Sequence, residues 1–321
     1  MDRLKKIFSH WEVFLATLLL LEIFVFGNLN PRILRPNIFL GSINDYSFII
    51  IVALFLTFVF LTGGIDIQSG AIMGLSSISL GILWKNYNLN IVSAILLVLL
   101  LGALCGLFSG IIVAYVGVQP MIVTLGGSFL FSGLAINISK IGVSSSFEGI
   151  SGFPEAFVDF AHIKIMGFPI LFILTLLFVV ILYIVLSKTP YGREVYLSGV
   201  SPNAMRYSGL NPKFIIASTY VISGFGASLA GILLTSYLGS ARPDAGNELT
   251  LPIITTVVLG GTLTTGGKGG VVGTVLAGFI IGFLKFGLSM IDVSTQYLNI
   301  PVGLLLIGIV ALRRVKKLKK A

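Results

Sequence analysis

Long apolar runs, separated by short polar segments, make up almost the whole sequence. Ten such runs occur, at residues 11–28, 47–63, 67–84, 91–116, 119–138, 168–186, 215–238, 250–265, 271–290 and 298–312. A helix needs about 20 apolar residues to cross a bilayer. The pattern therefore predicts an all-α, polytopic membrane protein with about ten transmembrane helices, in which residues 1–321 form a single transmembrane domain. Glycines interrupt the runs within 47–84 and 250–290, so the pattern leaves the helix ends open there.

The longest polar stretch is SKTPYGREVYLSGVSPNAMRYSGLNPKF, at 187–214. Ser201 followed by Pro202 is typical of a helix N-cap and first helical position, and Gly209 of a C-terminal stop. We therefore expect about two turns of helix over 202–208. Its basic residues surround an apolar middle (Met205, Tyr207 and Leu210), as in a surface that docks a soluble partner. The residues alone are also compatible with an ordinary loop.

The composition supports a membrane protein and excludes several other classes. Hydrophobic residues make up 56% of the chain and charged residues 10%, against roughly 25% charged in soluble domains. The single cysteine, Cys105, rules out a disulfide framework, and His10 and His162 lie far apart in sequence. We expect no metal site. The net charge of +9 is unevenly distributed along the chain and does not predict a nucleic-acid partner.

The distribution of positive charge predicts the orientation. An even number of spans puts both termini on one side, and short cytoplasmic loops carry an excess of Lys and Arg. With cytoplasmic termini, fourteen Lys and Arg lie inside, including Arg3, Lys5, Lys6, Lys319 and Lys320. Six lie outside: Arg32, Arg35, Lys85, Lys140, Lys164 and Arg242. The acids Asp45, Glu148, Glu155, Asp159, Asp244, Glu248 and Asp292 then also fall outside.

This orientation assigns the two longest loops. The segment 187–214 becomes a cytoplasmic loop, and 139–167 becomes the longest external loop. The aromatic and acidic residues of the external loop 139–167 predict a short interfacial helix near 154–161.

A glycine-flanked carboxylate interrupts the second and third runs, in GGIDIQSG at 63–70. Non-helical backbone at membrane depth is tolerated only where it faces protein or a water-filled cavity. Asp66 directly precedes the next helical run, so the favoured interpretation is a cap on that helix. The alternative is a functional intramembrane acid.

A second glycine-rich stretch, VLGGTLTTGGKGG at 258–270, superficially resembles a phosphate-binding loop. That motif needs Gly at the position of Thr262 and Ser or Thr at the position of Gly269. We therefore expect no nucleotide site and no cofactor bound by this chain. The stretch predicts a tight turn between two helices at the cytoplasmic face.

Small residues at helical spacing predict close helix packing. Gly102, Gly106 and Gly110 share one face of their run, and Gly273, Gly278 and Gly282 are spaced similarly in another. The short match between 124–127 and 258–261 hints at two related halves.

The polar groups within the runs are mainly hydroxyls and amides, which suit a path for a small, neutral, hydroxylated solute. Our candidates for the substrate pathway are Asp66, Gln68, Ser69, Thr124, Ser128, Asn137, Thr255 and Thr256. The alternative is a secondary transporter that works alone, with Glu22 or Asp66 coupling transport to an ion.

Four stretches resemble the membrane permease subunits of bacterial ABC importers for ribose and related sugars: 63–75, 118–127, 189–212 and 257–274. The resemblance implies a non-enzymatic subunit of the bacterial inner membrane. Its implied partners are two ATP-binding subunits that use ATP, a sister permease that completes a heterodimeric pore, a periplasmic solute-binding protein and membrane lipid. By the family's pattern, 202–209 match a coupling helix that docks on the ATPase. The implied ATPase-coupling residues are Arg193, Pro202, Asn203, Ala204, Met205, Arg206 and Gly209.

Three further stretches lie outside the shared sugar-permease core, at 10–34, 152–161 and 236–261. They are similar to permeases of the autoinducer-2 branch of this family, which implies autoinducer-2 as the cargo. Ribose or another simple sugar remains the alternative cargo.

Overall fold

The computed structural model describes residues 11–142 and 149–318. Predictions on Arg3, Lys5, Lys6, His10, Glu148, Lys319 and Lys320 lie outside these ranges. The long helices are α2 (Trp11–Leu29), α3 (Pro36–Leu61), α4 (Ser69–Lys85), α5 (Ile91–Ile111), α6 (Pro120–Gly142), α8 (Ile170–Lys188), α11 (Pro212–Leu238), α13 (Val271–Met290) and α14 (Asn299–Leu318).

Shorter elements connect them. The helical ones are η1 (Pro31–Leu34), the π-helical η2 (Ile112–Val116), α7 (Glu155–His162), α9 (Pro190–Val200), α10 (Pro202–Tyr207), η3 (Asn247–Leu249), α12 (Thr250–Leu259) and η4 (Thr295–Tyr297). Two antiparallel pairs of short strands complete the list: β1 (Ile150–Ser151) with β4 (Ser240–Ala241), and β2 (Lys164–Ile165) with β3 (Phe168–Pro169).

The all-α, polytopic fold class is confirmed, whereas the count of ten spans is not. Within the described residues, seven helices are long and apolar enough to cross a membrane: α2, α3, α5 with η2, α6, α8, α11 and α13. The remaining three predicted runs contain α4, α12 and α14, of which α4 has 17 residues.

Two predicted spans have wrong boundaries. The span predicted at 47–63 belongs to a helix that begins at Pro36, because extended Arg35 and the proline start it earlier. Asp45 is consequently part of α3 and not of a loop. The span predicted at 250–265 is wrong at its end, because α12 stops at Leu259. Gly261 has a positive φ of 107°, and Thr262 N–H turns back to the carbonyl of Val257.

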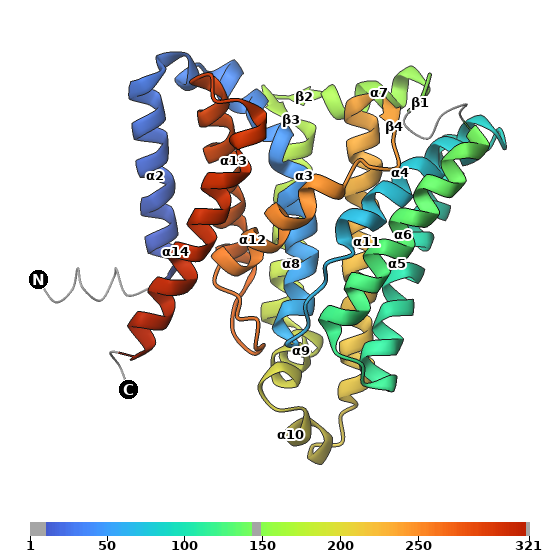
Figure 1. Cartoon of the computed structure of the whole chain (residues 1–321), viewed down its shortest axis with the longest axis vertical. Coiled ribbons are helices and arrows are strands. Elements are labelled where there is room, and N and C mark those ends of the chain that lie inside the picture. Colours follow the sequence, from blue (N-terminus) through green and yellow to red (C-terminus); the bar gives the residue numbers. More distant parts are fainter. Residues whose placement is uncertain (1–10, 143–148, 319–321) are drawn as a thin grey trace, which may run out of the picture.

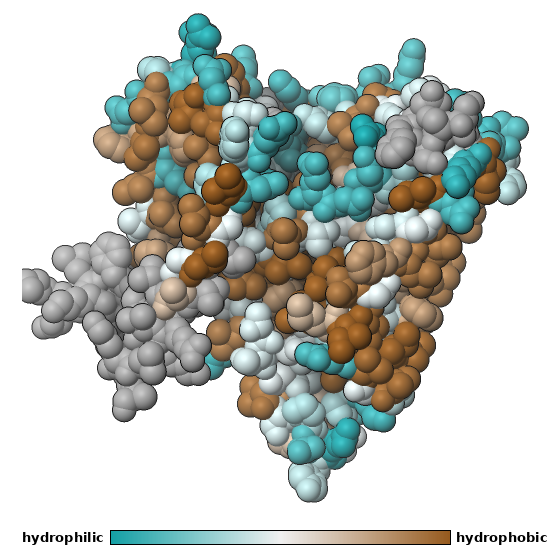
Figure 2. Space-filling model, viewed as in Figure 1, coloured by the Kyte–Doolittle hydropathy of each residue, from teal (hydrophilic) through white to brown (hydrophobic). Residues whose placement is uncertain are grey.

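Two helices form the centre of the bundle and the others surround them. In their apolar windows, 94% of α3 and 67% of α11 is buried, against 22% of α2 and of α6. Figure 2 shows hydrophobic residues across the middle of one face, with hydrophilic residues along the upper edge and at the lower tip. The exposed hydrophobic side chains of α5, α6 and α8 are therefore placed where lipid would solvate them.

The predicted glycine packing is confirmed. A Cβ atom at Gly110 would lie 2.8 Å from the carbonyl oxygen of Ala217, and one at Gly106 would clash with the carbonyl of Tyr220. On α11, Gly224 makes the reciprocal approach to α5. Backbone contact between α5 and α11 requires these glycines.

The two ends of the molecule carry different elements (Figure 1). The strand pairs and α7 lie at the upper end, and α7 confirms the short helix predicted near 154–161. Helices α9 and α10 project from the lower end. The described chain begins at the end of α2 that points away from η1, and it ends in α14 below that point (Figure 1).

The short internal match gives no support to two related halves. Residues 124–127 lie within the helix α6, whereas 258–261 span the C-terminal end of α12.

Candidate functional site

The break between α3 and α4 returns from the lower end of α3 toward the middle of the molecule, where α4 begins (Figure 1). Asp66 in this break is fully buried. Its Oδ1 accepts a hydrogen bond from the backbone N–H of Gln68 at 2.9 Å, and its Oδ2 accepts one from the Ser223 hydroxyl of α11 at 2.8 Å. Asp66 thus joins the break to the central helix.

The capping prediction for Asp66 needs a correction. The N-cap residue of α4 is Gln68, and its side chain makes no capping hydrogen bond. Asp66 binds the N–H of this N-cap residue instead of an N–H inside the helix. Helix α4 begins at Ser69, two residues later than it would with Asp66 as its direct N-cap.

Two other helices hold the same break. The hydroxyl of Ser109 on α5 donates to Gln68 Oε1 at 2.7 Å, and the hydroxyl of Thr124 on α6 lies 3.1 Å from the carbonyl oxygen of Ile65. A Cβ at Gly127 of α6 would clash with Gln68 Oε1, so this glycine admits the amide. The break is therefore fixed by side chains of α5, α6 and α11.

Three buried polar atoms near the break have no hydrogen-bond partner among the described residues: Gln68 Nε2, Ser69 Oγ and Tyr220 Oη. A Cβ at Gly64 would lie 2.6 Å from Tyr220 Oη, which brings this phenol against the break. Buried polar groups are costly unless they are hydrogen-bonded. Water or a hydroxylated solute could satisfy these atoms.

The structure divides the predicted pathway residues into groups. Asp66, Gln68, Ser69 and Thr124 meet at the break, whereas Ser128 is half-buried and Asn137 exposed farther along α6. Thr255 and Thr256 lie on α12, where each hydroxyl donates to a carbonyl of its own helix.

Ser109, Tyr220 and Ser223 belong to the site but were not among the predicted residues. Tyr220 and Ser223 are three positions apart on α11, and Ser109 lies beside Gly110 on the small-residue face of α5. The three-residue spacing on α11 and the place of Ser109 beside Gly110 are the sequence signals that could have identified these residues.

The segment predicted to dock a partner contains two helices. Ser201 Oγ accepts a hydrogen bond from Ala204 N–H at 3.2 Å, and Gly209 has a φ of 76°, so both predicted ends of α10 are confirmed. Pro202, Asn203, Ala204 and Arg206 are exposed, and Tyr207 is 94% exposed. Met205 is fully buried and supports the fold of the segment from inside.

Helix α9, which carries the exposed Arg193, connects α10 to the break. A Cβ at Gly199 of α9 would clash with the carbonyl oxygen of Leu61 at the end of α3. The N–H of Gly267 donates to that same oxygen at 2.8 Å. A Cβ at Gly266 would lie 2.7 Å from the nitrogen of Gly63 and 2.9 Å from the Cα of Gly199.

We call Gly63, Gly199, Gly266 and Gly267 the glycine junction. It brings the backbones of α3, α9 and the loop between α12 and α13 into contact. The phenol of Tyr196 also donates to the carbonyl of Gly269 at 2.9 Å. Burial raises the pKa of Tyr196, which keeps this donor protonated.

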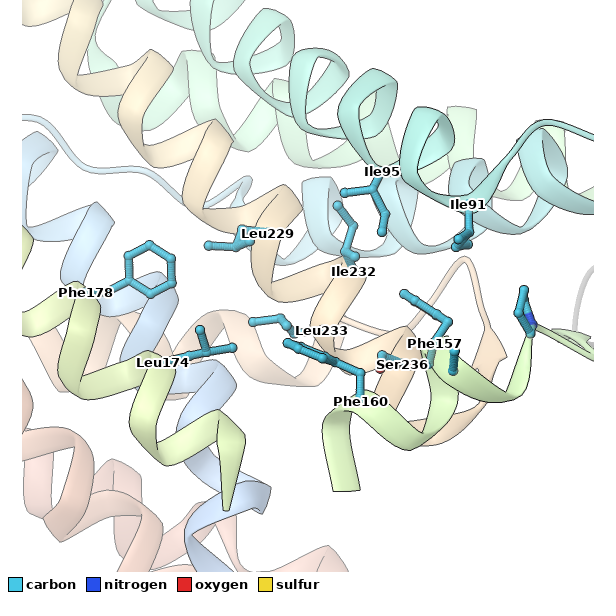
Figure 3. A pocket seen from close by; sticks show the side chains of 12 residues that line it. Ile91, Ile95, Phe157, Phe160, Leu174, Phe178, Leu229, Ile232, Leu233 and Ser236 are labelled. Carbon is cyan, nitrogen blue, oxygen red and sulfur yellow. Dashed lines mark hydrogen bonds between the residues drawn. The ribbon is translucent and has the colours of Figure 1, made fainter. Parts of the chain in front are cut away.

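An apolar pocket of about 430 Å³ lies between α5, α7, α8 and α11 (Figure 3). Its lining includes Ile95, Phe160, Leu174 and Phe178, and it contains no charged side chain. The hydroxyl of Ser236 already donates a hydrogen bond to the carbonyl oxygen of Phe157. A hydroxylated solute would lose hydrogen bonds here, so we do not assign this pocket to transport.

These features define a polytopic membrane protein with a buried polar break and a projecting segment in contact with it, which is the architecture of a permease. Residues 38–310 match the family described as branched-chain amino acid transport system / permease component. The chain belongs to this family of ABC transporter permeases.

Individual proteins of similar sequence include two bacterial permeases. The chain is 43% identical over 305 residues to the protein named "Autoinducer 2 import system permease protein LsrD" of Escherichia coli (strain K12). The matched region covers 95% of this chain and 92% of the relative. The protein of the same name from Shigella flexneri matches with the same identity and coverage. No solved structure matches.

Membership of this family gives the location of the chain, its general role and the kinds of protein it works with. The chain is a multi-pass protein of the inner membrane, and it is a transport permease. A permease of an ABC importer works with ATP-binding and solute-binding partners.

Proposed function

We propose that this chain is a membrane-spanning subunit of an ATP-driven importer that carries autoinducer-2 into the cell by alternating access. The names and identity of the relatives support the cargo. The chain performs no covalent chemistry in this proposal, and ATP is bound and hydrolysed on two separate partner subunits. A sister permease completes the pore, and a periplasmic protein delivers the solute.

The membrane topology in this proposal has ten spans and cytoplasmic termini. The excess of Lys and Arg on one side supports this orientation. Helices α9 and α10 then face the cytoplasm, and α7 with the strand pairs faces the periplasm.

The observation that carries the mechanism is the glycine junction. Movement of the exposed α10 is passed through α9 to the end of α3, because Gly199 and Leu61 are in backbone contact. Gly267 binds the same carbonyl, so the loop after α12 moves with them. Closure of the ATP-binding subunits thereby shifts the break at Asp66 and changes the side from which the solute path is open.

The exposed side chains of α10 provide a test of the docking assignment. We expect Tyr207→Ala combined with Arg206→Glu to abolish co-purification with the ATP-binding subunits and to abolish uptake, while the chain still inserts in the membrane. These two side chains are exposed and make no hydrogen bond that holds the fold.

Arg32→Glu is the matched control, because it reverses an exposed arginine at the opposite end of the molecule. It should leave co-purification unchanged. Normal co-purification and normal uptake by the α10 double variant would contradict the assignment of α10 as the coupling helix.

A further inference from the structure

A small pocket with two charged side chains in its lining, Asp45 and Lys285, lies between α3, α13 and η3 near the N-terminal part of α3. Its volume is about 230 Å³. The lining residues are Asp45, Tyr46, Ile49, Leu249, Gly282, Lys285, Phe286 and Ser289. None of them belongs to the break at Asp66 or to the glycine junction.

The pocket follows from two helix faces in close contact. Gly282, Lys285, Phe286 and Ser289 share one face of α13, since they are spaced by three and four residues. A Cβ at Gly282 would lie 2.6 Å from the Cβ of Tyr46, so only glycine lets α3 approach this far. The Tyr46 ring packs edge-on against Phe279, at 6.0 Å between ring centroids, which fixes one wall.

Among the described residues, only one oxygen of the Asp45 carboxylate has a hydrogen-bond donor. Its Oδ1 accepts a hydrogen bond from the Tyr237 hydroxyl at 2.8 Å. No donor within the described part of the chain binds Oδ2. Tyr237 is itself oriented by Phe48 and His162, at ring-centroid distances of 5.6 and 5.2 Å.

Lys285 places the opposite charge in the same pocket. It forms no ion pair with a carboxylate in residues 11–142 and 149–318, although Glu248 of η3 acts on it electrostatically. The carboxylate oxygens of Asp45 and the ammonium nitrogen of Lys285 are therefore more than 4.0 Å apart, and both residues line the space of the pocket. A solute in this space could donate to the carboxylate and accept from the ammonium.

The chemistry of the lining selects the kind of solute. Asp45 lines the pocket, and Glu248 acts on Lys285 from outside the lining, so the surrounding charges do not favour an anion. Carboxylate and ammonium groups both form strong hydrogen bonds with hydroxyl groups. Ile49, Leu249 and Phe286 offer apolar surface to a carbon skeleton. The volume is below the range of about 300–1,000 Å³ that is usual for drug-sized ligands.

We propose that this pocket is an outer binding site, where the permease receives a small, neutral, polyhydroxylated solute before the solute reaches the break at Asp66. The proposal rests on the proposed function, because it takes the chain to be an importer with α7 on the external side. Asp45 and Lys285 are its hydrogen-bonding residues, and Gly282 and Tyr46 shape it.

The test is uptake of autoinducer-2 by the complete transporter in proteoliposomes, measured over a range of delivered solute concentrations. We expect Asp45→Asn and Lys285→Gln each to raise the KM for uptake at least tenfold. The basal ATP hydrolysis and the unfolding temperature should stay unchanged, since neither side chain joins the coupling segment. Ser289→Phe at the exposed edge of the pocket should block it sterically and reduce uptake in the same way.

Two exposed residues of the outer side give matched controls. Asp292→Asn makes the same change as Asp45→Asn, and its positive φ of 62° is compatible with asparagine. Lys164→Gln matches Lys285→Gln. Both controls should leave the KM within about twofold of the wild-type value.

The outcomes separate this proposal from the function on which it rests. Wild-type uptake that needs ATP, with unchanged KM in Asp45→Asn, Lys285→Gln and Ser289→Phe, would overturn the outer site and leave the importer assignment intact. Wild-type protein without ATP-dependent uptake would overturn both.

Discussion

At the scale of single residues, Asp66 shows how a buried carboxylate can be structural. It accepts hydrogen bonds from the N–H of Gln68 and from the hydroxyl of Ser223, and it has no ion-pair partner within the described residues. An isolated carboxylate is expensive to bury, and charge-assisted hydrogen bonds reduce that cost. Both bonds tie the start of α4 to α11.

The structural role of Asp66 predicts a difference between two substitutions. In Asp66→Asn, the amide oxygen can still accept from Gln68, and the amide nitrogen can donate to Ser223, so unfolding in detergent should change little. Asp66→Ala leaves both donors unsatisfied and should cost about 1–3 kcal/mol in the free energy of unfolding. We expect Asp66→Asn to retain uptake.

Loss of uptake by a normally folded Asp66→Asn would contradict the structural role. That result would favour a carboxylate that itself couples transport to an ion.

Gly199 gives a second prediction at this scale. Gly199→Ala places a methyl group against the carbonyl of Leu61, and overpacking of this kind costs about 1–3 kcal/mol. Because this contact transmits movement in the proposed mechanism, we also expect ATP hydrolysis without uptake in the assembled transporter. Gly126→Ala is the control, since a Cβ there meets no atom within 4 Å.

Both glycines lie in helices, so the gain in helix propensity on going to alanine is similar for the two variants. Equal uptake and equal unfolding temperatures in Gly199→Ala and Gly126→Ala would show that the glycine junction does not couple the two segments.

At the scale of elements, the pair α5 and α11 holds the bundle together. Gly106 faces the backbone of Tyr220, and Gly224 faces the backbone of Gly102. Larger side chains would push the helices apart and separate Ser109 and Ser223 from the break that they bind.

Gly106→Val should therefore lower the unfolding temperature of the detergent-solubilised protein and reduce its folded yield. Gly133→Val on α6 is the matched control, because Gly133 is exposed and has open space beside it. Thermal unfolding of the two variants side by side is the measurement. Equal unfolding temperatures would rule out backbone contact between α5 and α11 as a main source of stability.

The elements that the sequence predicts well are those with local signals. Ser201, Pro202 and Gly209 mark both ends of α10 within the segment itself, and the structure has these ends. The end of the span predicted at 250–265 was wrong, whereas the glycines of 258–270 predict the tight turn that the backbone makes from Gly261 onward. Apolar composition alone does not report such a turn.

Contacts between distant segments could not be predicted. Asp66 and Ser223 are 157 residues apart, and Gln68 and Ser109 are 41 apart. Which polar side chains meet depends on how helices are ordered in the bundle, and a hydrophobic pattern carries no such order. The same limit applies to Asp45 and Lys285, which lie on α3 and α13 and share one pocket.

At the scale of the whole molecule, three features connect different sets of elements. The pocket lined by Asp45 and Lys285 involves α3 and α13, the break with Asp66 joins α3 to α4, and the glycine junction includes α9. In Figure 1, α7 lies at the upper end, α4 begins lower down, and α9 and α10 form the lower end. In the proposed mechanism, a force applied to α10 reaches the break through α9. This arrangement suits a subunit that is driven from outside its own chain.

The most direct test of the ATP-driven import of autoinducer-2 is uptake into proteoliposomes. They would contain this chain with its ATP-binding subunits and sister permease, with the solute-binding protein added and excess ribose as a competitor. We predict uptake that requires ATP and is insensitive to ribose. ATP-dependent uptake blocked by ribose would keep the class of importer and change the cargo to a sugar, whereas uptake that proceeds equally without ATP would contradict the central claim.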